Sequence, residues 1–515
     1  MAITVTLILL LLSASVCADA MHRHGREKDS SFDWENHGNG LQNHRRAKRS
    51  LIHVTNVAQL QRKWTFATGF DVSATPAVAE GTVYFPGWNG VLYALDERTG
   101  ELRWKLNMSS PLNGNFSSGS RATPVVWKER LLVGVLGPAR IIAINRHTGS
   151  LIWISPLLDS TPYSMITMSG TAYDGFFYVG TSSAEEVYTC CAFQGSMVKI
   201  NIDDGSVVWR TSMLPPNSGY YGAAVWGSSP SIDPDRRLVF IGTGNNYRVP
   251  KSVEVCEKER LKNSELSSDT CHDPENHEDS IVALSIDDGS IIWSRNLQAY
   301  DAWTAVCQFS PATATNCPSV LGPDYDFGEA PMLLYNGDAC NVLAGQKSGF
   351  MWALDCDTGS IIWATAAGPG GTFGGASWGS CSDNERVYTA IINNDAKNFT
   401  LAPGREVRTS GGWVAMNATT GHVIWTVGEP SGASPYGPVS VSNGVIFGTS
   451  YTPSGDIYAF DALSGAILWH AVAGPGVFGG VSISESCIFV GNGYHSFNPV
   501  KYNGTAVHAF CLPDD

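Results

Sequence analysis

Polar side chains with metal-binding and anion-binding chemistry follow four apolar, strand-like stretches of the chain. Glu185 ends the stretch 179–185, and Asn245 follows the glycine-rich stretch 241–244. Asp301 and Lys347 follow two later stretches of the same kind. A carboxylate with amide oxygens suits Ca²⁺, which takes about six to eight oxygen ligands, and an ammonium group suits an anionic oxygen. Each residue taken alone is also explained as a hydrogen-bonding group at a strand end.

Two adjacent cysteines, Cys190 and Cys191, form the most unusual local pattern. A bond between them would close a small strained ring, and such strain gathers at functional sites. Two reduced cysteines, or two that pair elsewhere, are the open alternative.

Two glycine-rich motifs lack the structural context that their chemistry needs. Residues 474–479 fit the dinucleotide pattern G-x-G-x-x-G, and residues 375–379 fit the nucleophile elbow G-x-S-x-G. Neither is followed by a helix in the sequence pattern, so we interpret both as loops. The chain also contains no C-x-x-C-H motif for an attached haem.

A repeated unit of strand, turn and strand organises the chain that positions these residues. The unit is first complete at residues 92–104, where apolar residues alternate around a turn that contains Asp96 and Gly100. Each copy closes on a tryptophan, and the seven copies end at Trp104, Trp153, Trp209, Trp293, Trp363, Trp425 and Trp469.

The two ends of the chain hold the halves of an eighth unit. Trp64 carries a closing half alone, and residues 505–512 carry an opening half alone. A spacing of about 58 residues per repeat suits four strands and their loops. We therefore predict an all-β fold, an eight-bladed β-propeller with tryptophan-docked blades, whose last blade is closed by an N-terminal strand. Residues 51–515 are expected to form this single domain.

The start of the chain predicts a secreted protein. Residues 1–20 have the apolar run and small-residue end of a signal peptide, and no later stretch is long and apolar enough to span a membrane. Residues 21–50 are polar, and we interpret them as a solvated segment, although residues 46–49 resemble a basic processing site. The net charge of −14 argues against nucleic acid and against an anionic membrane surface as partners.

Cysteines and glycosylation sequons are consistent with secretion. We expect bridges Cys256–Cys271, Cys307–Cys317 and Cys340–Cys356, each closing a short loop or hairpin, and Cys487–Cys511 across the closing blade. Cys381 is then left without a partner. Sequons begin at Asn107, Asn115, Asn398, Asn417 and Asn503.

The repeat resembles that of the pyrroloquinoline-quinone (PQQ) dehydrogenases, which are eight-bladed propellers, and most resembles their polyvinyl-alcohol-dehydrogenase-like branch. The resemblance runs from Trp34 to Cys511. It implies that Glu185 and Asn245 bind a Ca²⁺ ion that sits on PQQ. It also implies further cofactor-binding residues, namely Arg121, Thr167, Ser182, Trp226 beneath the planar ring, and Lys347 at a quinone carbonyl.

This chain departs from the family pattern at two places. The vicinal cysteines of the better-known alcohol dehydrogenases lie in an earlier stretch, so whether Cys190 and Cys191 reach the cofactor is open. The catalytic base of the family is an aspartate directly after a tryptophan, where this chain has Thr304. Asp301 is the candidate to replace it as base and as a third metal ligand, and Asp324 and Asp326 are alternatives.

Two functions remain in competition at this point. The first is a secreted dehydrogenase that uses PQQ and Ca²⁺ to oxidise a small or polymeric alcohol, with Lys347 and a carboxylate in catalysis and a separate electron acceptor. The second is a secreted propeller that binds partners or the extracellular matrix without chemistry, because propellers host many functions. Glu185, Asn245 and Lys347 favour the enzyme, and Thr304 favours the scaffold.

Overall fold

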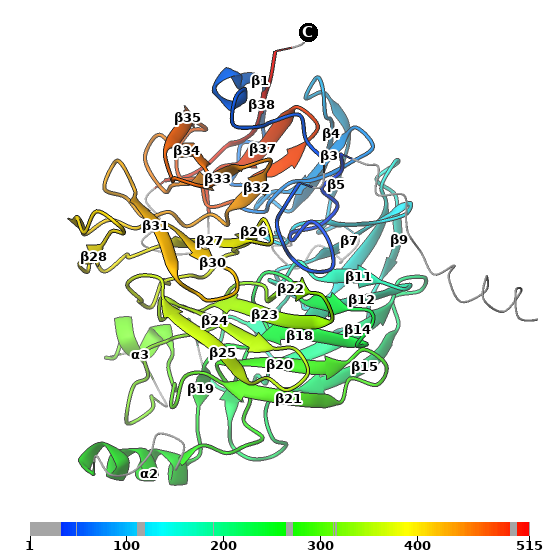
Figure 1. Ribbon diagram of the computed structural model, residues 1–515. Helices are drawn as coiled ribbons and strands as arrows, with labels where there is room; N and C mark the ends of the chain where they lie inside the picture. Colours follow the sequence, from blue (N-terminus) through cyan, green and yellow to red (C-terminus); the bar gives the residue numbers. More distant parts are fainter. Residues whose placement is uncertain are drawn as a thin grey trace, which may run out of the picture.

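The computed structural model describes residues 32–47, 49–110, 119–188, 190–263, 271–312, 314, 317–494 and 502–513. Within them the chain forms eight four-stranded antiparallel sheets arranged as a ring, which confirms the predicted eight-bladed propeller. In Figure 1 the ring runs from the blue blade at the upper right through green at the bottom to red at the top. The signal peptide predicted at residues 1–20 lies outside the described residues.

The blades are numbered here in chain order, each from its innermost strand outwards. Blades 1 to 4 consist of β2 (Ala77–Ala79), β3 (Thr82–Pro86), β4 (Val91–Asp96), β5 (Leu102–Asn107); β6 (Val125–Trp127), β7 (Arg130–Gly134), β8 (Ile141–Asn145), β9 (Leu151–Ile154); β11 (Thr171–Tyr173), β12 (Phe176–Gly180), β14 (Ser196–Asn201), β15 (Val207–Ser212); and β17 (Ser231–Asp233), β18 (Leu238–Gly242), β20 (Ser280–Ser285), β21 (Ile291–Asn296). Blades 5 to 8 consist of β22 (Met332–Asn336), β23 (Ala339–Gly345), β24 (Phe350–Asp355), β25 (Ile361–Ala366); β26 (Cys381–Ser382), β27 (Arg386–Ile391), β30 (Gly412–Asn417), β31 (Val423–Gly428); β32 (Ser440–Ser442), β33 (Val445–Thr449), β34 (Asp456–Asp461), β35 (Ile467–Val472); and β36 (Ser482–Ser484), β37 (Cys487–Gly491), β38 (Ala506–Cys511), β1 (Gln61–Ala67).

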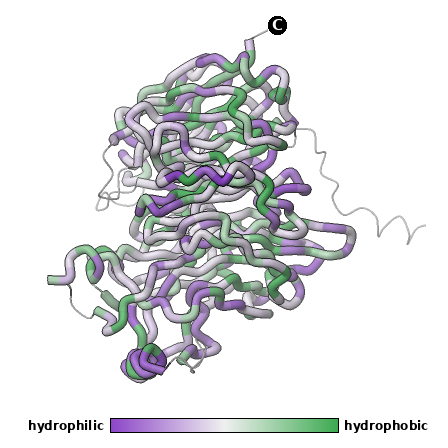
Figure 2. Tube along the Cα trace, turned by 60° about the vertical axis from the view of Figure 1, so that its left-hand side comes forward, coloured by the Kyte–Doolittle hydropathy of each residue, from purple (hydrophilic) through white to green (hydrophobic). Residues whose placement is uncertain are grey.

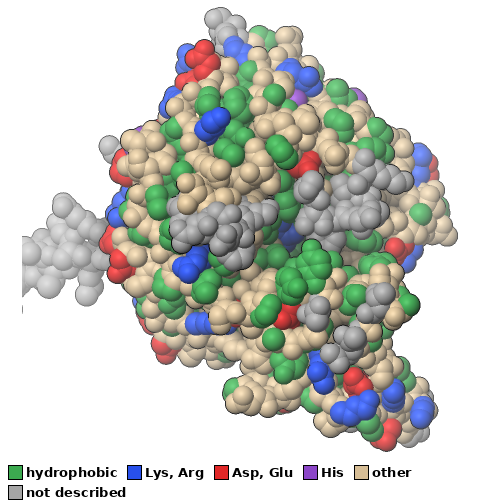
Figure 3. Space-filling model, turned by 180° about the vertical axis from the view of Figure 1, so that it is seen from behind, with side chains coloured by type: hydrophobic (Ala, Val, Ile, Leu, Met, Phe, Trp, Pro, Cys, Tyr) green, Lys and Arg blue, Asp and Glu red, His purple; other side chains and the backbone are tan. Residues whose placement is uncertain are grey.

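The remaining helices and strands lie in the segments that connect the strands of the blades. They are η1 (Val57–Gln59), α2 (Lys251–Lys262), α3 (Ala305–Phe309) and the small sheets β10 (Ser164–Met165) with β13 (Ser182–Ser183), β16 (Tyr221–Gly222) with β19 (Asn246–Arg248), and β28 (Phe399–Thr400) with β29 (Val407–Arg408). Helix α2 projects from the ring as a hydrophilic segment (Figure 2), and charged side chains gather on it (Figure 3). Within the described residues, every helix is too short or too polar to cross a membrane.

The tryptophan of each unit docks its blade onto the next one. Each of the eight indole Nε1 atoms donates a hydrogen bond to a backbone carbonyl of the following blade or of the segment that leads into it, from Trp64 to Glu97 (2.9 Å) round to Trp469 to Leu60 (2.9 Å). The turn glycine of the following unit lies against the indole ring. At Gly359, for example, a Cβ atom would come within 2.6 Å of the Trp293 ring. The repeated Trp and Gly are therefore the two halves of one contact between blades.

The ring closes as the sequence predicts, through the pairing of the first and last strands. β1 pairs antiparallel with β38, from Gln61 opposite Cys511 to Ala67 opposite Ala506, and the two strands lie together at the top of Figure 1. The Cys487–Cys511 disulfide links β37 to β38 within the same blade. Blade 8 is thus held by pairing, by tryptophan docking and by a covalent bond.

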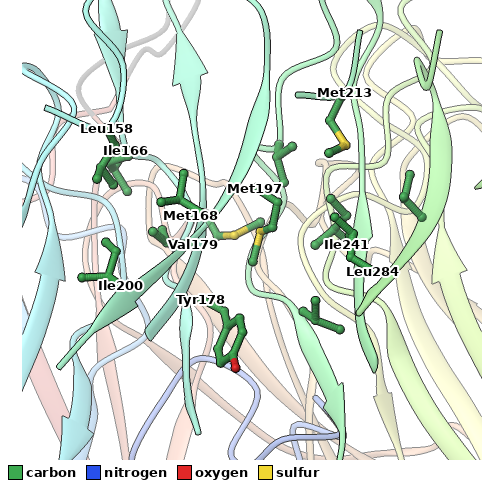
Figure 4. Close-up of a cluster of buried hydrophobic side chains, with 14 of the residues drawn as sticks. Leu158, Ile166, Met168, Tyr178, Val179, Met197, Ile200, Met213, Ile241 and Leu284 are labelled. Atoms are coloured by element: carbon green, nitrogen blue, oxygen red, sulfur yellow. The ribbon is translucent and has the colours of Figure 1, made fainter. Parts of the chain in front are cut away.

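Apolar side chains fill the space between neighbouring blades. Figure 4 shows one such cluster, in which Met168, Val179 and Met197 of blade 3 lie beside Ile241 and Leu284 of blade 4. All of these side chains are buried. The hydrophobic core is therefore a set of layers between blades, which explains why one domain accommodates so long a chain.

An N-terminal arm, residues 33–47 and 49–51, runs around the inside of the ring. Its backbone carbonyls accept hydrogen bonds from the innermost strands, as Leu41 does from Ile232 (2.9 Å) and Arg45 from Val441 (2.9 Å). Equivalent bonds reach six of the eight innermost strands, namely β2, β6, β17, β22, β26 and β32. The arm thus pairs inner strand edges that would otherwise leave backbone groups buried without partners.

In the described part of the segment 21–50, which was expected to be solvated, the arm is packed into the ring. Trp34, Asn43 and Arg45 are buried. The Arg45 guanidinium donates to the carbonyls of His37 (2.5 Å) and Val439 (2.8 Å) and to the Ser440 hydroxyl (3.0 Å). No carboxylate pairs with Arg45 in the described part of the chain, and burial lowers the pKa of Arg45 to about 9. Polar side chains of the arm make hydrogen bonds to backbone and hydroxyl groups inside the ring. The packed structure therefore begins well before residue 51.

All four predicted disulfides are confirmed, and Cys381 is free and buried. Cys190 and Cys191 are bonded to each other, which decides the alternative left open by the sequence. Of the sequon asparagines, Asn107, Asn398 and Asn503 are exposed, Asn417 is half-buried, and Asn115 lies outside the described residues. Glycosylation and processing at residues 46–49 stay predictions.

The docking contact predicts unequal effects of two glycine substitutions. Gly359 (φ +66°) lies on Trp293, whereas a Cβ atom at Gly337 (φ +62°) would have no other atom within 4 Å. Both Gly→Ala variants carry the backbone cost of about 1–2 kcal/mol, but Gly359→Ala adds about 1–3 kcal/mol of overpacking. Denaturant unfolding is expected to show the larger loss for Gly359→Ala. Equal losses would contradict the docking contact.

The closing blade is expected to weaken in acid through His508, which lies on β38 and bonds Thr65 of β1 (3.0 Å). Burial, followed by the charge of Arg62, lowers the pKa of His508 to about 4. The unfolded chain therefore binds a proton between about pH 6.5 and pH 4 that the folded chain does not, and stability falls as the pH falls through this window. The loss is on the order of 3 kcal/mol. His508→Phe should lack this component of the pH profile, and an unchanged profile would contradict the assignment.

Candidate functional site

The predicted site residues lie at one end of the propeller axis, in loops or, for Ser182, in the short strand β13. Arg121, Thr167 and Trp226 precede innermost strands of blades 2, 3 and 4. Asn245 and Lys347 follow the second strands of blades 4 and 5, and Ser182 and Glu185 follow that of blade 3. Loops into innermost strands and loops after second strands share one end, because successive strands of a blade alternate in direction. The fold therefore brings site residues that are far apart in the sequence to the same end of the ring.

The Asp326 carboxylate accepts hydrogen bonds from three of the predicted site residues. Its Oδ2 accepts hydrogen bonds from Trp226 Nε1 (2.8 Å) and from Lys347 Nζ (3.1 Å), and its Oδ1 accepts from the backbone N–H of Asn245 (2.7 Å). Lys347 also pairs with Asp324 Oδ1 (2.8 Å). Burial alone would lower the pKa of Lys347, but the neighbouring carboxylates outweigh it and raise that pKa, which favours the charged form of Lys347.

Two cations lie over the ring of Trp226. Lys347 Nζ is 5.3 Å from the ring centroid, and the Arg121 guanidinium carbon is 5.6 Å from it. Arg121 also lies over Trp378 at 5.3 Å and donates to the Tyr494 hydroxyl (2.5 Å). The Thr167 hydroxyl donates a hydrogen bond to the backbone carbonyl of Trp226 (3.4 Å). An aromatic face with two cations suits a planar ligand that carries negative charge.

The vicinal disulfide lies beside this aromatic face. Cys190 packs in a small apolar cluster with Phe193, Ala224 and Tyr247, and Cys191 and Trp226 pack against that cluster. The position of the cysteine pair in the sequence therefore differs from the family pattern, while its position in space is next to the predicted ring-stacking residue.

The two predicted metal ligands are each oriented by the backbone. Glu185 Oε2 accepts from the N–H groups of Ala192 (2.9 Å) and Phe193 (3.0 Å), and burial raises the pKa of Glu185. Asn245 Nδ2 donates to the carbonyls of Asn246 and Trp303 (both 2.8 Å), so its Oδ1 is the atom left to face a ligand. In the described ranges, no group of three or more His, Cys, Asp and Glu side chains is arranged to hold a metal ion. The Ca²⁺ site stays a prediction.

The Asp301 side chain binds the backbone of the loop that contains Asp324 and Tyr325. Its two carboxylate oxygens accept from the backbone N–H groups of Asp324 (3.1 Å) and Tyr325 (2.6 Å), and the side chain is fully buried. Burial, assisted by the charge of Asp326, raises the pKa of Asp301. This geometry gives Asp301 a clear role in fixing the segment that carries Asp324 and Asp326, which in turn hold Lys347.

Thr304 has a structural role in place of the family's aspartate. It is the N-cap of α3, where its hydroxyl accepts from the backbone N–H of Cys307 (3.4 Å), and it is buried. Aspartate and threonine both serve as N-caps, so the local structure is compatible with either residue.

Sequence reasoning missed Glu186, which is half-buried beside the charged centre. Burial raises the pKa of Glu186 to about 7, opposed by the charge of Lys347 and assisted by that of Asp326. Its backbone carbonyl accepts from Val306 of α3 (3.1 Å), next to Thr304. The one signal in the sequence is that two glutamates follow each other, and the motif assigns a role only to Glu185.

The chain is similar to known proteins over most of its length. The family model described as outer membrane protein assembly factor BamB matches residues 48–276 and 277–494. Polyvinylalcohol dehydrogenase of Sphingopyxis sp. (strain 113P3) is 27% identical over 513 residues, covering 90% of this chain and 72% of that protein. Quinoprotein alcohol dehydrogenase PedH of Pseudomonas putida is 22% identical and covers 91% of this chain and 88% of its own.

Among solved structures, quinohemoprotein alcohol dehydrogenase from Comamonas testosteroni superposes with a TM-score of 0.70. It covers 98% of this chain and 85% of its own at 19% identity. At that identity the likeness concerns the fold, and it supports the eight-bladed ring independently of the repeat.

The buried ion pair predicts strong coupling between Lys347 and its partners. Lys347→Gln leaves two buried carboxylates without their cation and is expected to cost about 3–5 kcal/mol of unfolding free energy. Adding Asp324→Asn should recover part of that loss in a double-mutant cycle measured by denaturant unfolding.

The exposed pair of Lys397 and Asp395 (3.1 Å) provides the control. Lys397→Gln is expected to cost no more than about 1 kcal/mol because solvent screens the pair. Equal costs for the two lysine variants would show that the Lys347 cluster is not a buried charge centre.

Proposed function

Because the chain belongs to the family whose model is described as outer membrane protein assembly factor BamB, and because two polyvinylalcohol dehydrogenases are 25–27% identical to it, we propose that it is a quinoprotein-type dehydrogenase of the polyvinylalcohol-dehydrogenase-like branch that oxidises an alcohol with PQQ. Electrons then pass to a separate acceptor, since the chain lacks a haem attachment motif. The observation that carries the proposal is the meeting of Trp226, Lys347 and Asn245 at Asp326. Nothing within a single blade requires these residues to converge.

The residues present fit a planar, polyanionic quinone. Trp226 would support the ring, and Arg121 and Lys347 would face its anionic oxygens. Thr167 supplies a hydroxyl next to Trp226, Ser182 pairs in β13 with Met165, two residues before Thr167, and the Cys190–Cys191 disulfide packs in the neighbouring cluster. When bound, PQQ supplies the two-electron acceptor chemistry that no side chain has.

Ca²⁺ belongs to the proposal as a partner of the cofactor. Asn245 Oδ1 and a carboxylate oxygen of Glu185 are the protein oxygens that remain for it. Further ligands must come from other groups, because Ca²⁺ takes about six to eight oxygens.

Carboxylates beside Lys347 are the side chains of the site that could accept a proton from an alcohol. Asp324 lies beside Lys347 and is better placed than Asp301 or Asp326, because both carboxylate oxygens of each of those two aspartates already accept hydrogen bonds. Lys347 holds positive charge where negative charge would gather on an oxygen. Burial of this cluster strengthens each of these electrostatic interactions.

We also propose that the protein is secreted. The apolar run of residues 1–20 and the five disulfides of the described chain support an oxidising compartment. The rival function, a non-enzymatic scaffold, is favoured by one observation, the presence of Thr304 at the position where the family pattern has its catalytic aspartate.

Cofactor binding is the first test of the proposed function. Purified protein with Ca²⁺ and PQQ is expected to bind the quinone stoichiometrically in a calorimetric titration. Glu185→Ala should weaken binding because a charged oxygen ligand is lost. Absence of binding at any Ca²⁺ concentration would leave the scaffold function.

Alcohol oxidation with an artificial electron acceptor tests the second step separately. If PQQ binds without turnover, Thr304→Asp is expected to produce turnover, whereas Thr304→Asn, which keeps the helix cap without the charge, should not. Equal behaviour of the two variants would show that position 304 is not where a base is missing.

A further inference from the structure

Three aromatic rings form a row that leads outwards from the candidate site. Trp303 is 4% exposed, and its ring centroid lies 6.4 Å from that of Phe309 in an edge-on arrangement. Phe309 is 56% exposed and stacks on the half-buried Phe373, with centroids 6.0 Å apart. Asn245 of the site donates from its Nδ2 to the Trp303 carbonyl (2.8 Å). The buried end of the row therefore adjoins the site.

The two outer rings of the row are carried by segments that also contact the site. In the loop that carries Phe373, the Gly371 N–H donates to the carbonyl of Lys347 (3.1 Å). In α3, which ends at the other ring, the Val306 N–H donates to the carbonyl of Glu186 (3.1 Å). The row is thus joined to the charged centre through the backbone of two blades.

A second pair of aromatic rings follows the same stretch of chain. Tyr188 comes two residues after Glu186, and its ring centroid lies 5.1 Å from that of Tyr163. The two tyrosines are 60% and 50% exposed. Single exposed apolar side chains are ordinary, but a group of them beside a candidate site marks a place where something binds.

The size of this aromatic patch, defined as Tyr163, Tyr188, Phe309 and Phe373, fits a small ligand better than a protein. A large aromatic side chain presents about 150–250 Å² of surface, so the three that are half exposed offer roughly 300–400 Å². A stable protein partner needs about 800 Å² on each side. None of the four side chains is charged, so the part of the ligand that they contact is apolar.

We propose that the aromatic patch binds the apolar body of the substrate, an alcohol that carries an aromatic ring system, and that Phe309 and Phe373 select for it. This inference rests on the proposed function and names the substrate class of the same site. Aromatic rings attract one another edge-on or offset, and the row beginning at Trp303 offers further rings of that kind. The hydroxyl end of such an alcohol would lie toward Lys347 and Asp324.

The experiment is an equilibrium-dialysis titration of the full chain, without cofactor, with 2-naphthalenemethanol. Saturable binding is expected. Phe309→Ala should raise the dissociation constant at least fivefold, because an aromatic contact worth about 1 kcal/mol corresponds to about fivefold in affinity. Tyr188→Ala, on the other side of the patch, should act in the same direction.

Phe70→Ala is the matched control, because Phe70 is 51% exposed and lies between β1 and β2, outside the patch. It should leave the dissociation constant unchanged. Absence of saturable binding, an unchanged constant in Phe309→Ala, or an equal loss in Phe70→Ala would each overturn the proposal.

Turnover of the PQQ-loaded enzyme separates this inference from the proposed function. In Phe309→Ala, the ratio of kcat/KM for 2-naphthalenemethanol to that for ethanol should fall at least fivefold. An unchanged ratio would overturn the role of Phe309 in substrate selection. Absence of turnover together with Phe309-dependent binding would contradict the proposed dehydrogenase and support the aromatic ligand site alone.

Discussion

Eight innermost strands meet around one axis, and their inner edges carry backbone groups that need hydrogen-bond partners. An unpaired buried N–H or C=O costs roughly 1–3 kcal/mol, so a ring of bare edges would be a large penalty. The N-terminal arm meets this constraint at six of the eight innermost strands. Its own carbonyls serve as acceptors, and Arg45 bonds further carbonyls and hydroxyls in the channel. The ring is thus tied from the inside by the arm and from the outside by β1.

This tied ring explains how loops from different blades hold a charged cluster in place. Asp326 joins Trp226, Asn245 and Lys347, and Asp301 fixes the loop that carries Asp326. A buried cation with two carboxylates carries a desolvation cost that only well-placed partners offset. Rigid blades supply that placement, because docking through tryptophan and glycine fixes each blade against the next.

Local patterns in the sequence were sufficient for the fold. The Trp and Gly of each unit, the split eighth unit and the cysteine spacings predicted the ring, its closure and four disulfides, since each is a short-range feature with one geometric meaning. The arm was misjudged because polar composition normally indicates solvated chain, whereas here the polar groups pair with the channel wall. Arg45 illustrates the point, because its partners are carbonyls and hydroxyls contributed by distant blades.

The sequence identified part of the site, because motifs mark single residues but not the contacts between residues of different blades. Trp226, Lys347 and Asn245 were identified from motifs, but the sequence does not say that Asp326 joins them. Thr304 stands where the family pattern has its base, and Asp301 was the candidate to replace it. The structure shows Asp301 holding a loop and Thr304 capping α3. Glu186 was missed because its position beside Lys347 depends on how α3 packs against the loop after β13.

Hydrogen–deuterium exchange of the inner-strand amides tests the central claim, that the arm ties the ring, most directly. The amides of Val126, Ile232, Leu333, Ser382 and Val441 donate to carbonyls of the arm. The account predicts that these five amides are protected as strongly as amides in the middle strands of the blades. Exchange as fast as that of exposed loops would show that the arm does not pair the inner edges in solution.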